Sequence, residues 1–198
     1  MYLDIRTLDV ANVILCSVFG PVSFAFGSGP YALPSRFWGA ALLALAGGLA
    51  LVNLQGHLPD YVSELIGPVL FALALTLAQA CARSIRGPGG RDVLGWALFA
   101  IFALAMLALQ SASNSATLHH FLEMEFTGLL ACKAAYEFLR CRELPEGGPM
   151  QALATIFCLL GAVLLVEGLL GSPRHDASAT IEADLIGGLM RVGMIAGL

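Results

Sequence analysis

The chain has 198 residues, of which 58% are hydrophobic and 12% are charged, and its formal net charge is −4 at pH 7. Soluble domains carry about 25% charged residues, so this composition excludes an ordinary soluble domain. The acidic balance supplies no basic face, and we expect no nucleic-acid partner. The 5 cysteines contain no Cys-x-x-Cys pair, so neither a zinc site nor a disulfide framework is predicted.

Apolar runs separated by short polar turns predict an all-α membrane protein, a seven-transmembrane-helix bundle that forms one domain over residues 1–198. Each run approaches the length of about 20 residues that a bilayer core requires. Pro21 falls inside the first run, where neighbouring helices can satisfy the freed carbonyl. Trp38 and Trp96 start the second and fourth runs, as an interfacial aromatic belt would. The predicted spans are 9–26, 37–54, 62–82, 93–110, 118–139, 150–170 and 181–198.

The third run gives the predicted bundle its direction. An acidic turn at 57–60 precedes it, and Arg83, Arg86 and Arg91 follow it. The positive-inside rule places this arginine loop in the cytoplasm. Alternating the remaining spans then puts most of the Lys and Arg residues on the same side. The sequence therefore predicts an N-terminus outside and a C-terminus in the cytoplasm.

One lysine, Lys133, lies within the fifth run, before Arg140. Long basic side chains near a helix end can extend to the membrane surface while their stems stay in the apolar region. Glu137 follows four residues later, on the same face of a helix. We therefore expect Lys133 to reach toward the inner surface and to pair with Glu137.

The last run stops at Leu198 with neither a basic stop nor a polar tail. Inner ends of membrane helices ordinarily carry Lys or Arg. We expect this chain to be the membrane part of a longer protein, truncated before a cytoplasmic output domain. A protein that is short by nature is the alternative.

Two stretches resemble a known family. The opening Leu3-Asp4-Ile5-Arg6-Thr7-Leu8 is similar to the Leu-Asp-Val-Arg-Thr-Leu start of many bacterial multi-span sensor regions. Those regions precede diguanylate cyclase domains of the GGDEF type. The stretch from Gly56 to Arg86 also resembles the family, with a Leu-Pro-Asp-aromatic turn, an apolar helix and spaced arginines.

The resemblance implies a multi-pass input module of the bacterial inner membrane, usually a homodimer through its transmembrane helices. Such a module passes a signal to a cytoplasmic domain, here a diguanylate cyclase that acts in c-di-GMP signalling. The chain contains no Gly-Gly-Asp-Glu-Phe signature, so cyclase activity would lie beyond Leu198. We therefore expect the chain itself not to be the enzyme.

Acidic residues and all 4 histidines gather on the predicted outer side. The positive-inside rule does not account for the acids, which contribute little to orientation. An ionisable group at the bilayer centre costs about 3 kcal/mol, and such groups usually face the bundle interior. We therefore predict an outward-facing ligand site for an unidentified small ligand or cation. Its residues would be Glu64, His119, His120, Glu123, Glu125, Glu167, Asp184 and Arg191.

His119 and Glu123 are four residues apart and share a helix face. An imidazole and a carboxylate together could bind a divalent metal ion, with His119 and Glu123 as the candidate metal ligands. The same groups could instead titrate near neutral pH, or line a wet cavity and only hydrogen-bond one another. Arg191 also needs a partner within the membrane, for which Asp184, Glu123 and Glu125 are the candidates.

Two other classes of membrane protein provide the alternatives. A metal-dependent membrane hydrolase would need a Ser-x-x-x-His motif, which Ser115 and His119 match, and a later His-x-x-x-His, which the sequence lacks. A cation or small-solute transporter would show internal repeats and broken helices with polar groups at the midplane. Pro21 and Gly67-Pro68 could break helices, but no repeat is visible.

Overall fold

The computed structural model describes residues 5–54, 56–59, 61–87, 92–112, 116–141 and 147–170. Within these ranges every regular element is helical, and 5 helices are long and apolar enough to cross a membrane. The predicted all-helical class, with helices long and apolar enough to span a membrane, is therefore confirmed at this level. The count of seven spans and the orientation of the termini stay predictions, and the seventh predicted span, 181–198, lies outside the described residues. The helices are α1 (Ile5–Phe26), α2 (Ala32–Asn53), α3 (Gly67–Arg86), α4 (Val93–Ala112), α5 (Ala116–Leu139) and α6 (Gly147–Leu170).

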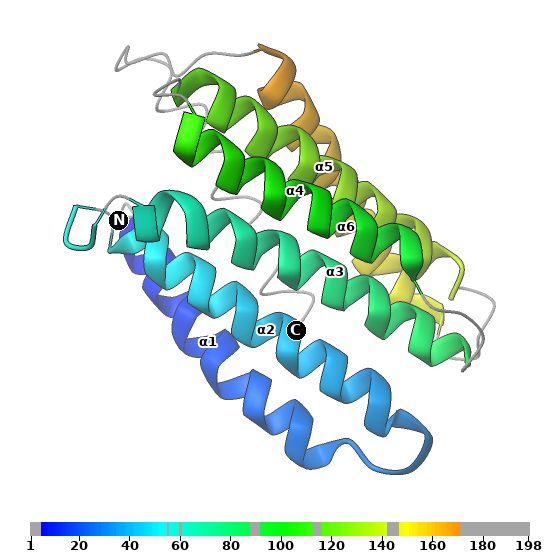
Figure 1. Ribbon diagram of the computed structural model, residues 1–198. Coiled ribbons are helices and arrows are strands. Elements are labelled where there is room, and N and C mark those ends of the chain that lie inside the picture. Colours follow the sequence, from blue (N-terminus) through cyan, green and yellow to red (C-terminus); the bar gives the residue numbers. More distant parts are fainter. Residues whose placement is uncertain are drawn as a thin grey trace.

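The helices run back and forth between the same two ends of one bundle (Figure 1). We call one end the arginine end; it holds the C-termini of α1, α3 and α5 and the N-termini of α2, α4 and α6. The opposite end, which we call the acidic end, holds Glu64, His119 and Glu123. The segregation of charge read from the sequence therefore corresponds to two ends of the folded bundle.

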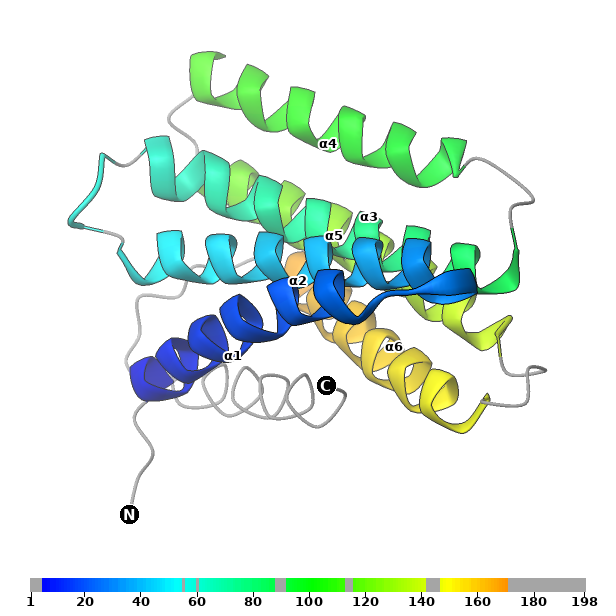
Figure 2. The ribbon, with the colours of Figure 1, turned by 90° about the horizontal axis from the view of Figure 1, so that it is seen from below.

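Helix packing does not simply follow chain order. α1 packs on α2, α2 on α3, α3 on α5, and α5 on α6, while α4 packs against α3 and α5. Figure 2 shows α4 on one side of the bundle and α6 on the opposite side. α5 consequently lies between α3 and α6, although it carries the charged residues Glu123, Glu125, Lys133 and Glu137. These charges exclude α5 from the apolar spans, yet it is a central helix.

Proline and glycine account for the local shape of α3. A π-helical turn, Val62–Ile66, leads into the helix, and Pro68 occupies its first turn, where a missing N–H removes no intrahelical bond. At the other end Gly87 has a φ of 123°, which favours glycine. The helix therefore stops directly after Arg83 and Arg86, and both arginines remain at the arginine end.

Three pairs of neighbouring helices approach each other through glycines. A Cβ built on Gly128 of α5 would lie 3.2 Å from the carbonyl oxygen of Gly161, and one built on Gly161 would lie 3.0 Å from that of Gly128. Small residues at such crossings let membrane helices pack backbone against backbone. The facing glycines are Gly20 and Gly39 for α1 and α2, Gly48 and Gly67 for α2 and α3, and Gly128 and Gly161 for α5 and α6.

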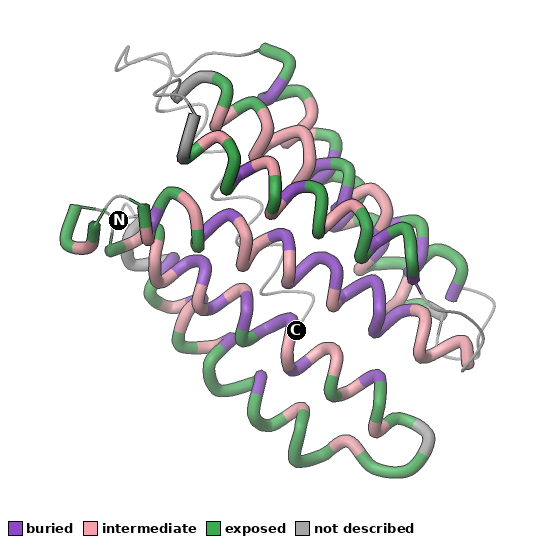
Figure 3. Tube along the Cα trace, in the orientation of Figure 1, coloured by how far each residue is buried: buried purple, intermediate pink, exposed green. Residues whose placement is uncertain are grey.

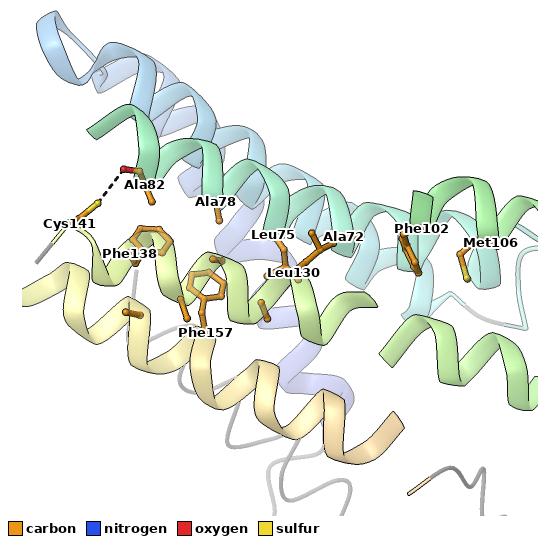
Figure 4. Close-up of a cluster of buried hydrophobic side chains, with 14 residues drawn as sticks. Ala72, Leu75, Ala78, Ala82, Phe102, Met106, Leu130, Phe138, Cys141 and Phe157 are labelled. Carbon is orange, nitrogen blue, oxygen red and sulfur yellow. Dashed lines mark hydrogen bonds between the residues drawn. The ribbon is translucent and has the colours of Figure 1, made fainter. Parts of the chain in front are cut away.

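Buried apolar side chains from α3, α4, α5 and α6 form the main core (Figure 4). Phe138 stacks on Phe157 in this core, with ring centroids 5.5 Å apart and planes at 6°. Trp38 from α2 packs edge-on against Phe138, with ring centroids 6.3 Å apart. Small residues dominate the α3 side of this core. In Figure 3, buried residues accordingly follow much of α3, whereas α4 alternates with many exposed ones.

Candidate functional site

A partly buried lysine organises the contact between α3, α4 and α5. Lys133 Nζ donates hydrogen bonds to both carboxylate oxygens of Asp92 at 2.7 Å and to Gln79 Oε1 at 2.8 Å. Gln79 Nε2 in turn donates to the carbonyl of Leu130 at 2.9 Å. Asp92 also caps α4, because it accepts a hydrogen bond from the Gly95 N–H at 3.0 Å. The Lys133 ammonium therefore holds the start of α4 against α3 and α5.

A second carboxylate, Glu137, lies one turn further along α5 and is only 1% exposed. Arg83 donates to its Oε1 from Nε at 2.9 Å and from Nη2 at 2.8 Å, and Arg86 Nη2 donates to its Oε2. Arg83 Nη2 also lies 3.6 Å from Asp92 Oδ1, which joins the two halves. We call the whole set the arginine-end network: Gln79, Arg83, Arg86, Asp92, Lys133 and Glu137.

The partners in this network differ from the expected pairing of Lys133 with Glu137. Lys133 reaches Asp92 and Gln79, while Glu137 binds arginines of α3 that lie 54 and 51 residues earlier in the chain. An exposed i,i+4 pair contributes only about 0.5 kcal/mol, so partners on a packed neighbouring helix readily displace it. Gln79 within an apolar run was the sequence signal for this network, because a buried amide requires hydrogen-bond partners.

Asp92 is the network carboxyl that lies outside the helices, directly before α4. Its burial acts to raise its pKa, because the charged form loses solvent. The hydrogen bonds from Lys133 and the Gly95 N–H, together with the positive charges of Lys133 and Arg83, outweigh that effect and hold the pKa below its usual value. Asp92 is therefore ionised in the folded protein at neutral pH and serves as the counter-charge of Lys133.

The predicted outer ligand site stays a prediction, and two of its eight residues lie outside the described part of the chain. Glu123 on α5 and Glu167 near the end of α6 lie close enough for their charges to repel each other. Glu64 is exposed on the π-helical turn, which packs against α2, α3 and α4. The structure describes Glu64, His119, His120, Glu123, Glu125 and Glu167, whereas Asp184 and Arg191 lie outside the described residues.

Glu125, at the acidic end, has a carboxylate oxygen that lacks a hydrogen-bond donor among the described residues. This oxygen, Oε1, is buried. Gly168 of α6 lies directly beside it, since a Cβ built on that glycine would be 2.7 Å from the oxygen. A buried carboxylate oxygen without a donor is costly. The interface between α5 and α6 therefore contains an acid with an unsatisfied buried oxygen.

The described residues contain no complete ligand set for the predicted metal ion. Within them, no group of three or more His, Cys, Asp or Glu residues is arranged to hold a metal ion. Protein zinc sites use about three or four such ligands. His119 and Glu123 would thus need further ligands from solvent or from other parts of the chain.

No protein-family model, curated protein or solved structure matches this chain. The features that point to a function are therefore the two polar clusters and α5, the helix that carries residues of both.

Proposed function

We propose that this chain is a membrane-embedded sensory input module. It perceives a signal at the acidic end and transmits it through α5 to the arginine end. From there the signal passes to a cytoplasmic output domain, which the sequence resemblance suggests is a diguanylate cyclase. The observation that supports this proposal is that α5 contributes Glu123 and Glu125 to one polar cluster and Lys133 and Glu137 to the other.

The segment of α5 between the two clusters favours transmission. Leu130, Ala131 and Ala134 are fully buried against the neighbouring helices. Closely packed interiors transmit displacement because they have few voids to absorb it. A displacement of α5 caused by neutralising or ligating Glu123 would therefore reach Lys133 and Glu137. The ion pairs there provide an element that can exchange between discrete arrangements.

The chain carries its own reporter of this coupling. It has only 2 tryptophans, and both belong to the arginine end. Trp38 packs on Phe138, which follows Glu137 directly, and Trp96 follows Gly95 in the first turn of α4. Tryptophan emission from the chain in lipid nanodiscs therefore reports on the end of the bundle opposite to Glu123.

The test titrates pH and, separately, a divalent cation while tryptophan emission is recorded. We expect the emission to change in the wild type and the change to be lost in Glu123→Gln. Glu64→Gln is the matched control, because Glu64 is an exposed acid at the same end but not on α5. It should keep the wild-type response. A response that survives in Glu123→Gln, or is absent from the wild type in both titrations, would contradict transmission through α5.

A further inference from the structure

Helix α4 is attached to the bundle by two contacts of different kinds, and the first is apolar. Phe102 and Met106 on its inward side are both 0% exposed, and Phe102 lies against Phe126 of α5 with ring centroids 5.7 Å apart. Most other described residues of α4 are exposed, and Figure 2 shows the helix on the outer side of the bundle. A methionine side chain is flexible and fits alternative packings. This contact therefore allows α4 to tilt without detaching.

The second contact is polar and holds the start of α4. Asp92 accepts hydrogen bonds from the Gly95 N–H and from Lys133 Nζ, which also donates to Gln79 Oε1. The backbone of Gly95 lies against both acceptors, since a Cβ built there would clash with the Asp92 carboxylate and lie 2.6 Å from Gln79 Oε1. We call Gln79, Asp92, Gly95 and Lys133 the α4 latch. Hydrogen bonds weaken steeply with distance and angle, so the latch has a closed and an open state.

We propose that the α4 latch is a conformational device whose opening lets the start of α4 move away from α3 and α5, while Phe102 and Met106 keep the helix attached. Lys133 lies on α5 and is the donor to both side-chain acceptors, so a shift of α5 weakens both bonds together. Asp92 without this ammonium is a charge at a site where its side chain is 3% exposed, and water is the better environment for it. An outward movement of the α4 start brings Asp92 to water.

The trigger of this movement rests on the proposed sensory function, in which α5 is displaced. The latch itself is a property of the contacts between α3, α4 and α5. A bundle element with two discrete arrangements is what a transmitted displacement requires. The latch thus identifies α4 as the helix that receives the signal from α5.

The experiment measures how far the start of α4 lies from α2, which contributes no residue to the latch. Spin labels are attached through Ala97→Cys on α4 and Leu33→Cys on α2, two exposed positions toward the arginine end. A second pair, Leu107→Cys and Leu54→Cys, reports on the acidic end of the same two helices. The 5 native cysteines are first replaced by alanine or serine. Pulsed electron paramagnetic resonance then gives the distribution of distances in lipid nanodiscs.

Two substitutions open the latch by different routes. Lys133→Met removes the donor, whereas Gly95→Ala keeps every charge and places a methyl group where Gln79 Oε1 and the Asp92 carboxylate lie. We expect both variants to add the same longer distance at the arginine-end label pair and to leave the acidic-end distance unchanged. Arg83 remains near Asp92, so the shorter and longer distances should coexist. If neither variant adds a longer distance, or if both label pairs lengthen together, the latch is overturned.

Glu137→Gln is the matched control for the loss of a buried charge. Glu137 lies one turn after Lys133 on α5, and its described partners are Arg83 and Arg86 of α3. This variant should keep the wild-type distances at both label pairs, although it also breaks ion pairs of the arginine-end network. A longer distance in this control would show that any damage to the network moves α4, and would overturn the role of the Lys133–Asp92 bond.

Titration of the labelled wild type with pH and with a divalent cation separates the latch from its trigger. A rise in the longer distance during either titration supports the link between the acidic end and the latch. Opening in the variants without any response to the titrations would refute the sensory trigger and leave the latch standing. A tryptophan response in the wild type without opening in the variants would refute the latch and leave the sensory function standing.

Discussion

At the scale of single residues, Lys133 shows how a charge between packed helices is accommodated. Its ammonium makes three short hydrogen bonds, two to Asp92 and one to Gln79, and its side chain is 12% exposed. Polar groups in a low dielectric are stable when each donor has an acceptor. The arrangement therefore turns a charge that would be costly in lipid into a link between α4 and α5.

Removal of that lysine should be severe. In Lys133→Met, the Asp92 carboxylate, which is 3% exposed, keeps the more distant Arg83 as its one counter-charge among the described residues. Breaking one side of a buried ion pair costs about 3–5 kcal/mol, so we expect a loss of that size in the free energy of unfolding. Denaturant unfolding in mixed micelles measures it. The double variant with Asp92→Asn should lose clearly less than the sum of the two single losses; additive losses would contradict the pairing.

Asp92 should also make the stability depend on pH in one direction. Its pKa is held below the usual value of 3.8, so its ionised form stabilises the folded state. This contribution is fully present above that usual value and is lost as the pH falls through the lower folded-state pKa. We expect the stability difference between wild type and Asp92→Asn to be constant near neutrality and to shrink below about pH 4. Thermal melts of both proteins across an acid pH series measure this difference. A difference that stays constant below about pH 4 would contradict the prediction.

At the scale of helices, α5 depends on close approach as well as on ion pairs. A Cβ on Gly161 would lie 2.5 Å from Cys132 Sγ and 2.9 Å from the Cys132 backbone nitrogen. The helix backbone cannot move away as a flexible side chain could. The contact between α5 and α6 therefore requires glycine at this position.

Gly161→Ala should force α6 away from α5. Overpacking of a well-packed interior costs about 1–3 kcal/mol, and we expect a loss of that size in denaturant unfolding. Gly148→Ala is the matched control on the same helix, because a Cβ there would meet nothing within 4 Å. It should leave the free energy of unfolding nearly unchanged. Equal behaviour of the two variants would show that the glycine contact is not required.

At the scale of the whole molecule, the two ends of the bundle differ in charge, and the arginine end is expected to face the cytoplasm. Alkaline phosphatase is active only outside the cytoplasm, so fusions after Gly56 and Asn114 should be active. Fusions after Pro88 and Gly147 should be inactive. The measurement is enzyme activity per amount of fusion protein in intact cells. The reverse pattern would invert the direction of the proposed signal.

The membrane class and the helices were readable from the sequence because they depend on local properties. A run of apolar residues about as long as the bilayer core is thick forms a helix whatever its neighbours are, since its backbone must satisfy itself. α4 starts at the predicted residue, Val93, and α5 ends at the predicted one, Leu139. Gly87 and the arginines before it likewise marked where α3 stops.

The partners of the charged residues depended on which helix faces meet, and sequence spacing does not contain that information. Lys133 and Glu137 share a helix face, yet each binds a side chain from elsewhere, because α5 packs against α3 and the start of α4. The glycine contact between Gly128 and Gly161 brings α6 onto another part of α5. Glu137 is thus buried and Lys133 partly buried between helices, although the sequence suggested surface groups near a helix end. Long-range packing outweighs the weak preference for a neighbour one turn away.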